Sequence, residues 1–479
     1  MLGFVMIVPQ NCYNFKEENG LITILLMIAV ILYLALQLED KLSIPSPLGL
    51  IALSFVVHYI FQQVPVLTGD AEHFATLVVF LLPILLLSDS LELKLADLKE
   101  HGLSLLYLAV VSVILSVLMA LFVSSWLFAG VTLSSAAVIV LFAMVLATDP
   151  VSVVSIFSKF ELPHRLKILA EGESLFNDAT ALIVFVFVGL YALGGGALTA
   201  GYVAEISGEV VFGSVAVGVV TGFVGLTLMK STENRTAEMM ILVITGYGSF
   251  ELSEHFFVLI NWLGGHSHLH LSGILSCIFA TITVNHVMTK ALAEDSRQID
   301  SDEITLKLEA DNRDTSPSVI ASVLRRIEAT IEERERHLRS KEDVQLLALV
   351  ANTILFIAMA EMIDIDLLWK YKIEILVMFL ATTFIRGAMM GLFAWLSNTT
   401  DKMVDINLRW WSVLTFAGIK GGLSIVMITM IPASFEHLEM FKAVVIGVIV
   451  LSTFIYSGAL IYIIGRNREL FLIEKHAEH

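Results

Sequence analysis

Long runs of apolar residues recur along the whole chain and are separated by short polar segments. The runs have about 18 to 28 residues, enough for a helix to cross a hydrocarbon core of about 30 Å. Strands of a membrane barrel alternate apolar and polar residues, whereas these runs are continuous, so helices are favoured. We therefore predict an all-α integral membrane protein with 13 transmembrane helices. The predicted spans are residues 20–38, 45–62, 73–91, 102–127, 131–158, 165–193, 201–229, 236–261, 268–288, 343–362, 371–396, 409–432 and 438–464.

The polar segments between the spans predict the orientation, because lysine and arginine favour the cytoplasmic side of short loops. An odd number of spans places the two termini on opposite sides. With the N-terminus outside, the outer segments hold only Lys16, Lys370, Lys372 and Lys442. The cytoplasmic segments then hold Lys41, Lys94, Lys99, Lys159, Arg165, Lys167, Lys230, Arg235, Lys402, Arg409, Arg466, Arg468 and Lys475. This distribution predicts a multi-pass cell-membrane protein with a cytoplasmic C-terminus.

A charged stretch divides the predicted helices into two groups. We expect a short outer tail at 1–19, helices 1–9 within 20–293, a charged cytoplasmic loop at 294–342, helices 10–13 within 343–465 and a cytoplasmic tail at 466–479. The loop is interpreted either as a solvated, partly helical segment or as a regulatory amphipathic helix on the membrane surface. The apolar residues with helical spacing in it are Val319, Ile320, Val323, Leu324, Ile327 and Ile331.

Composition excludes several other classes. Apolar residues make up 57% of the chain and charged residues 16%, against about a quarter charged in soluble domains. The net charge of −17 and the lack of a basic patch argue against nucleic-acid binding. Cys12 and Cys277 lie far apart, and Cys277 is inside an apolar run, which argues against a disulfide framework or a zinc site.

One predicted span contains a proline that interrupts the helix next to an acid. The fifth span ends its apolar stretch in Ala-Thr-Asp-Pro at 147–150. Pro150 lacks a backbone N–H and disfavours helix at Asp149. An opened turn frees carbonyls and helix ends that can interact with a cation, and Asp149 adds a negative charge there. The alternative is a simple proline kink with a hydrogen-bonded Asp149.

The sixth span contains several polar residues where a charge costs about 3 kcal/mol. Spacings of four place Glu173 with Asn177, and Ser174 with Asp178, on adjoining faces of one helix. Oxygen ligands suit hard cations, and a buried carboxylate can also hold a proton near neutral pH. One carboxylate that binds a cation and a proton in turn would make exchange obligatory.

Two basic residues lie in later spans. Arg386 requires a buried anion, and Glu173 is the predicted partner; the alternative is that Arg386 extends to a membrane interface. Lys420 lies among glycines at 418–422, which predict a second unwound segment. Lys420 is expected either to neutralise the two facing helix C-termini or simply to lie near a membrane face. Both breaks fall in the fifth helix of a six-helix half, which predicts inverted repeats whose interrupted helices cross at the midplane.

These motifs together resemble the monovalent cation:proton antiporters of the NhaP/NHE type. Ala-Thr-Asp-Pro-Val at 147–151 and Gly-Glu-Ser-Leu-Phe-Asn-Asp-Ala at 172–179 are similar to that family's two signature helices. The arginine of span eleven and the Gly-x-basic-Gly break of span twelve follow in the same order. The resemblance covers roughly residues 20–465, apart from the charged loop. It implies a homodimer in membrane lipid, with a core of helices 4–6 and 11–13 moving against a dimerisation domain of helices 1–3 and 7–10.

The resemblance also implies roles for individual residues. It implies that a Na⁺ ion binds to Asp149, Asp178, the Thr148 carbonyl and the Ser174 side chain, and that Asp178 alternates between cation and proton. Asn177 before Asp178 is similar to the electroneutral branch of the superfamily. Glu173 and Arg386 match the family's buried ion pair. Apart from the transported ions, no cofactor is implied.

Two departures from the family pattern leave the transported ion open. The family has a second proline in span three and an acid four residues later, where this chain has Ile84 and Ser88. Asp89 follows one residue later and is a candidate accessory ligand. Lys420 stands where the family has arginine, and lysine lacks the planar fork of guanidinium. Selectivity among Na⁺, Li⁺ and K⁺, and the response to pH, are therefore left open.

Three other classes of protein fit the sequence less well than a secondary antiporter does. A cation channel or uniporter would use similar oxygen ligands, but the sequence has no Thr-Val-Gly-Tyr-Gly filter. An intramembrane aspartyl protease would use Asp149 and Asp178 as a dyad, but the Gly-x-Gly-Asp context is absent. His-Glu-x-x-His is also absent, which argues against a zinc protease. We therefore expect a transporter and not an enzyme.

Overall fold

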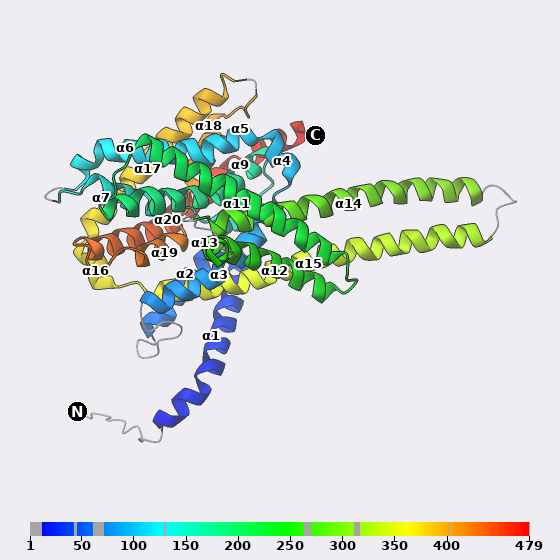
Figure 1. Cartoon of the computed structure of the whole chain (residues 1–479), viewed down its shortest axis with the longest axis horizontal. Coiled ribbons are helices and arrows are strands. Elements are labelled where there is room, and N and C mark those ends of the chain that lie inside the picture. The colour runs from blue at the N-terminus through cyan, green and yellow to red at the C-terminus, as the bar shows by residue number, and fades with distance from the viewer. Residues whose placement is uncertain are drawn as a thin grey trace.

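The computed structural model describes residues 12–42, 46–60, 71–128, 131–262, 270–310, 317–400 and 402–478. Every regular element in these ranges is a helix (Figure 1). Eight helices in this part of the chain are long and apolar enough to cross a membrane, and a shorter apolar helix covers Leu48–Tyr59. The prediction of an all-helical protein with many apolar spans is confirmed, and the count of 13 stays a prediction.

The first three helices each contact a later helix, α15 (Pro317–Glu361). They are α1 (Cys12–Leu42), α2 (Ser46–Ile60) and α3 (Ala71–Glu92). α1 packs against α2, and α2 and α3 pack against α15. Gly49 of α2 lets the two helices approach closely, since a Cβ there would lie 3.4 Å from the Ala35 Cα. α1 begins inside the predicted outer tail, eight residues before the expected span start at 20.

The next helices carry the first polar motifs, and one of them, α7, is buried along most of its length. α7 is apolar on all sides and buried from Ala137 to Leu146, which places it at the centre of the bundle. Two π-helical turns, η1 and η2, lie within the flanking spans. The elements are α4 (Leu95–Glu100), α5 (Gly102–Leu106), η1 (Tyr107–Val111), α6 (Ser112–Leu127), α7 (Ser135–Leu146), α8 (Pro150–Phe157), α9 (His164–Ile183), η2 (Val184–Leu190) and α10 (Tyr191–Leu193).

Small residues allow close packing of the middle helices. They are α11 (Ala200–Met229), α12 (Arg235–Glu254), α13 (Phe256–Trp262) and α14 (Gly273–Ala310). Gly218 and Gly222 of α11 face the backbone of α14, because Cβ atoms there would lie 2.4 Å and 2.8 Å from the carbonyl oxygens of Ser276 and Ala280. Glycines four residues apart are a common means of bringing two membrane helices into contact.

The charged stretch at 294–342 lies mostly within two long helices. α14 continues to Ala310, and α15 (Pro317–Glu361) begins well before the tenth predicted span. The outer parts of α14 and α15 project together from the body (Figure 1). We call residues 289–310 and 317–342 the helical arm. Both interpretations of this stretch stay predictions; α15 continues from it without interruption into the apolar span Ile327–Ala360. High helix propensity of Glu, Arg, Leu and Ala explains why a charged segment stays helical.

The last helices include an unexpected one. They are α16 (Ile365–Lys370), α17 (Lys372–Ser397), α18 (Leu408–Phe416), α19 (Leu423–Thr429), α20 (Leu438–Arg466) and α21 (Arg468–Ala477). The predicted C-terminal tail forms α21, whose Phe471 is fully buried and whose Glu474 accepts from Asn407 and Trp410 at 2.9 Å each. α21 thereby docks onto the start of α18.

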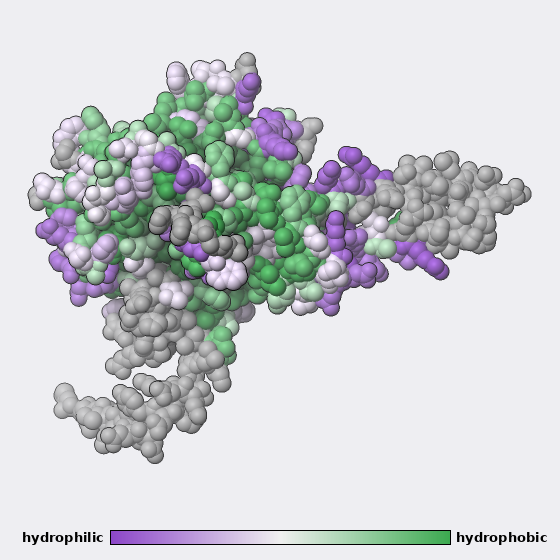
Figure 2. All heavy atoms as spheres, viewed as in Figure 1, coloured by the Kyte–Doolittle hydropathy of each residue, from purple (hydrophilic) through white to green (hydrophobic). Residues whose placement is uncertain are grey.

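The surface of the body is largely apolar, with polar residues at its ends and at the base of the helical arm (Figure 2). Large apolar side chains are exposed on several long helices, including Phe212 (78%), Trp126 (74%) and Phe384 (69%). Such extensive apolar exposure would be unfavourable in water and suits contact with lipid. Buried polar side chains at the two interrupted helix pairs, α7–α8 and α18–α19, include Thr148, Ser152 and Lys420.

Candidate cation site

The first interrupted helix exposes backbone groups next to an acid. Residues 147–149 separate α7 from α8, and Asp149 caps the N-terminus of α8 in an extended conformation. Its Oδ2 accepts from the Ser152 backbone N–H at 3.3 Å and from the Ser152 hydroxyl. Pro150 occupies the first turn of α8, where its missing N–H leaves no bond unmade. The sequence therefore ends one helix and starts another within three residues.

The second signature helix, α9, supplies the side chains that hold this break open. The Thr148 N–H donates to Asp178 Oδ1 at 2.9 Å, and the Ser174 hydroxyl donates to Thr148 Oγ1 at 2.8 Å. The Asn177 amide donates to the Leu146 carbonyl at 2.9 Å and to Thr148 Oγ1 at 3.1 Å. These bonds satisfy groups that the missing helical turn leaves free and fix Asp178 beside Asp149.

The second break crosses the first at the same point. Residues 417–422 separate α18 from α19, and the Asp149 N–H donates to the Ile419 carbonyl at 2.7 Å. A Cβ at Gly421 would lie 2.8 Å from the Asp149 Cβ, so a residue without a side chain allows this crossing. Lys420 is buried, and its Nζ donates to the Leu146 carbonyl at the C-terminus of α7 at 3.3 Å. A positive charge there is favourable for the helix dipole.

A buried ion pair braces the crossing from the side. Arg386 donates from Nη1 and Nη2 to the two carboxylate oxygens of Glu173 at 3.0 Å and 2.8 Å. The same guanidinium donates to the Leu414 and Thr415 carbonyls near the end of α18, each at 2.9 Å. One side chain therefore connects α17, α9 and the second interrupted helix, using the bidentate geometry for which arginine is suited.

The groups around the crossing differ in burial and in whether their polar atoms have hydrogen-bond partners. Thr148, Glu173, Ser174 and Asn177 are each at most 2% exposed. Asp178 is 7% exposed, and Asp149 is half-buried. Within the described residues, the amide oxygen Oδ1 of Asn177 is buried and has no hydrogen-bond partner. A buried acceptor without a donor suits a water molecule or a cation.

The accessory acid lies on a neighbouring helix. Asp89 is half-buried on α3. It lies close enough to Asp149 and Asp178 for the negative charges of the three carboxylates to repel one another. Glu171 of α9 also acts on Asp89, although sequence reasoning gave Glu171 no role. Two serines were missed as well: Ser152 donates to Asp149, and Ser452 accepts the Lys420 N–H at 3.1 Å. Only Ser152 had a signal, because it follows a helix-capping Asp by three residues.

The chain also matches a described protein family. A family model described as the transmembrane part of sodium/hydrogen exchangers matches residues 25–301. The chain belongs to this sodium/hydrogen exchanger family. The match includes both signature helices, α7–α8 and α9, and stops before Arg386 and Lys420.

Several curated antiporters are similar in sequence. The Na⁺/H⁺ antiporter NhaH of Halobacillus dabanensis is 26% identical over 54% of this chain and 62% of its own length. NhaG of Bacillus atrophaeus is 31% identical over 45% of this chain and 42% of its own length. ApNhaP of Aphanothece halophytica is 24% identical over 79% of this chain and 61% of its own length. The chain thus spans less than two thirds of these curated relatives.

The fold of a solved exchanger extends over nearly the whole chain. The sodium proton antiporter MjNhaP1 of Methanocaldococcus jannaschii superposes with a TM-score of 0.67 over 94% of this chain and 99% of that one. The sequence identity is 16%, so this likeness shows the fold alone. The chain therefore has the NhaP1 antiporter fold.

Gly421→Ala is expected to weaken cation binding while leaving the protein folded. The added methyl would contact the Asp149 Cβ and force the two breaks apart by a few tenths of an ångström. We expect a several-fold higher apparent KM for the cation, measured by flux in vesicles at a fixed pH. Gly458→Ala on α20 is the matched control, because a Cβ there meets nothing within 4 Å. An unchanged KM in Gly421→Ala would contradict the tight crossing.

Proposed function

We propose that this chain is a secondary antiporter that exchanges Na⁺ for H⁺, with Asp178 binding the two in turn. The observation that carries the proposal is the position of Asp149 and Asp178 at the crossing of two interrupted helices. The unpartnered amide oxygen of Asn177 lies in the same cluster. Relatives named as Na⁺/H⁺ antiporters support the same two transported ions.

The charges at the crossing favour a ratio of one cation to one proton. Asp149, Asp178 and Glu173 face Arg386 and Lys420, which leaves one net negative charge when all five groups are ionised. One bound Na⁺, or one proton on Asp178, brings this charge to zero. Both loaded forms are then neutral, whereas the empty form carries a charge that is costly to move through a low-dielectric environment. Exchange is therefore obligatory and electroneutral.

The ligands proposed for Na⁺ are the carboxylates of Asp149 and Asp178, the Ser174 hydroxyl and the Thr148 carbonyl. The Ser174 hydroxyl donates its proton to Thr148 Oγ1 at 2.8 Å, which leaves the lone pairs of the Ser174 oxygen free to bind a cation. Asn177, Glu173, Arg386 and Lys420 hold the two breaks in position, and Asp89 is an accessory acid.

The same proposal includes the movement that exposes the site to each side in turn. In it, helices 4–6 and 11–13 of the 13-span topology form a core that moves against a dimerisation domain of helices 1–3 and 7–10. The two halves are inverted repeats, and two chains form a homodimer in the cell membrane. The N-terminus lies outside and the C-terminus in the cytoplasm.

Flux in vesicles tests the function directly. Purified protein is reconstituted in liposomes with an imposed pH gradient and an internal pH dye, and Na⁺, Li⁺ or K⁺ is added. We expect Na⁺ to move protons, with a rate that does not change when the membrane potential is clamped at different values. If only K⁺ moves protons, the transported cation is K⁺ and not Na⁺. Cation flux without proton movement would favour a channel or uniporter instead.

A further inference from the structure

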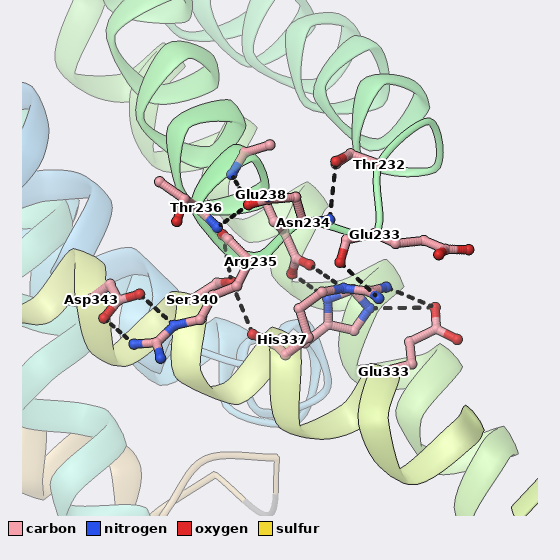
Figure 3. A network of polar contacts seen from close by, with 12 residues as sticks. Thr232, Glu233, Asn234, Arg235, Thr236, Glu238, Glu333, His337, Ser340 and Asp343 are labelled. Atoms are coloured by element: carbon pink, nitrogen blue, oxygen red, sulfur yellow. Dashed lines mark hydrogen bonds and ion pairs between the residues drawn. The ribbon is translucent and has the colours of Figure 1, made fainter. Parts of the chain in front are cut away.

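A buried carboxylate joins the helical arm to the body. Glu238 of α12 is 1% exposed and is contacted by two consecutive residues of α15 (Figure 3). Arg336 donates from Nε to Glu238 Oε2 at 2.9 Å, and His337 Nδ1 contacts Glu238 Oε1. A buried carboxylate is stable only when it is paired, so these contacts hold the base of the arm against α12.

Both ring nitrogens of His337 face carboxylates. While Nδ1 contacts Glu238, Nε2 lies 3.6 Å from Glu333 Oε1 (Figure 3). A neutral imidazole has one N–H and one acceptor nitrogen, so it would present a lone pair to one of the two carboxylates. Only the imidazolium suits both. The geometry therefore allows a protonated His337 to interact with both acids.

The other charged groups near His337 do not replace it. Arg336 is shared between Glu238 and Glu333, at 2.9 Å and 3.8 Å, and also donates to the Glu233 carbonyl at 3.5 Å. On α12, Arg235 is bound to Asp343 of α15. Lys230, Glu233 and Glu332 line the same cavity of about 440 Å³ as His337, and α14 contributes Val287, Met288 and Ala291 to its wall. This cavity gives His337, which is 13% exposed, access to water.

We propose that Glu238, His337 and Glu333 form a proton-dependent latch that fastens the helical arm to α12. In the proposed topology the latch lies on the cytoplasmic side. Histidine is the side chain whose charge ordinarily changes between about pH 5 and pH 8. Loss of the proton removes one of the two charge-assisted contacts and leaves Arg336 as the remaining cation on Glu238.

The helix that carries the latch also contacts the surroundings of the transport site. Lys341 of α15 contacts Asn285 Oδ1, and the Asn285 amide donates to the Leu91 and Leu93 carbonyls at 2.9 Å and 2.7 Å. These carbonyls lie at the C-terminal end of α3, the helix that carries Asp89. Gln345 donates to Glu92 at the same end at 3.0 Å.

Further along, α15 reaches the second helix break. Leu355 lies against Gly422, where a Cβ would meet its Cδ2 at 2.7 Å. α15 is one continuous helix from Pro317 to Glu361, so a shift at His337 is transmitted along it to Leu355. This coupling to transport rests on the proposed function, whereas the latch itself does not.

Hydrogen exchange measured by mass spectrometry tests the latch without using transport. In the full-length protein, we expect backbone amides at 235–245 and 330–345 to exchange about tenfold faster at pH 8 than at pH 6, after correction for intrinsic rates. His337→Arg keeps the charge at both pH values and should stay protected. His337→Gln cannot become charged and should exchange quickly at both. Equal pH dependence in wild type and both variants would overturn the latch.

Na⁺ flux in the same preparations tests the coupling. At equal pH on both sides, His337→Arg at pH 8 should retain the fraction of activity that wild type shows at pH 6, and His337→Gln at pH 6 should behave like wild type at pH 8. His164→Gln is the control, since His164 is 61% exposed and lies 3.6 Å from Asp97 in another cluster. A normal exchange profile with no flux in any protein would reject antiport and keep the latch. Flux profiles identical in all proteins would reject the coupling.

Discussion

Asp178→Asn is expected to reduce Na⁺-driven proton movement to the level of protein-free vesicles. Asparagine has nearly the same shape and retains an oxygen that can accept the Thr148 N–H, now 2.9 Å from Asp178 Oδ1. The fold and the first helix break should therefore persist. The substitution removes the carboxylate that binds a proton and replaces it with a group that stays neutral at any physiological pH. The cluster of Asp149, Asp178, Glu173, Arg386 and Lys420 then loses the net negative charge that Na⁺ and H⁺ neutralise in turn.

The measurement is the rate of internal pH change after a Na⁺ pulse, compared with the amount of folded protein in the same vesicles. Asp405→Asn is a suitable control, because it makes the same chemical change at an exposed position before α18. Asp178→Glu is expected to retain partial activity with an altered apparent affinity for Na⁺. Exchange at the wild-type rate in Asp178→Asn would remove Asp178 from its proposed role and shift attention to Asp149.

The sequence alone allowed much of the crossing to be anticipated. Charge in an apolar span is costly, so few arrangements satisfy Arg386, and Glu173 is the acid that bonds to it in the structure. Proline after Asp149 predicted a break, and α7 ends at Leu146, four residues before Pro150. Each of these inferences depends on a rule with a large free-energy cost, which is why the sequence alone suggests it.

Other features depend on contacts that no local pattern reveals. The charged stretch was expected to be either a solvated, partly helical segment or a surface helix, and only the structure shows α14 and α15 continuing through it as long helices. α21 was expected to be a tail because ten residues give too short a pattern; its docking depends on Phe471 and on donors from α18. Ser452 contacts Lys420 from a helix more than thirty residues away, and no spacing predicts this.

Arg386→Ala is expected to lower the yield of folded protein and its stability to heat. The substitution leaves Glu173, 1% exposed, without its bidentate partner, and removes the donors to the Leu414 and Thr415 carbonyls. Removing one partner of a buried ion pair costs about 3–5 kcal/mol, because the remaining charge stays buried and unpaired. The loss should also disturb transport, since α18 loses its connection to α9.

A double-mutant cycle separates the ion pair from simple loss of packing. Glu173→Gln with Arg386→Met removes both charges and should recover much of the stability lost in Arg386→Ala, because no isolated charge remains. Arg386→Lys should fall between wild type and Arg386→Ala, since lysine keeps the charge but cannot bond both carboxylate oxygens and both carbonyls at once. The measurement is the midpoint of thermal unfolding in detergent for wild type, Glu173→Gln, Arg386→Met, the double variant, Arg386→Ala and Arg386→Lys. If Arg386→Ala unfolds at the wild-type temperature, the pair does not stabilise the crossing. If the double variant is as unstable as the sum of the single ones, the loss comes from packing around Arg386 and not from an unpaired Glu173.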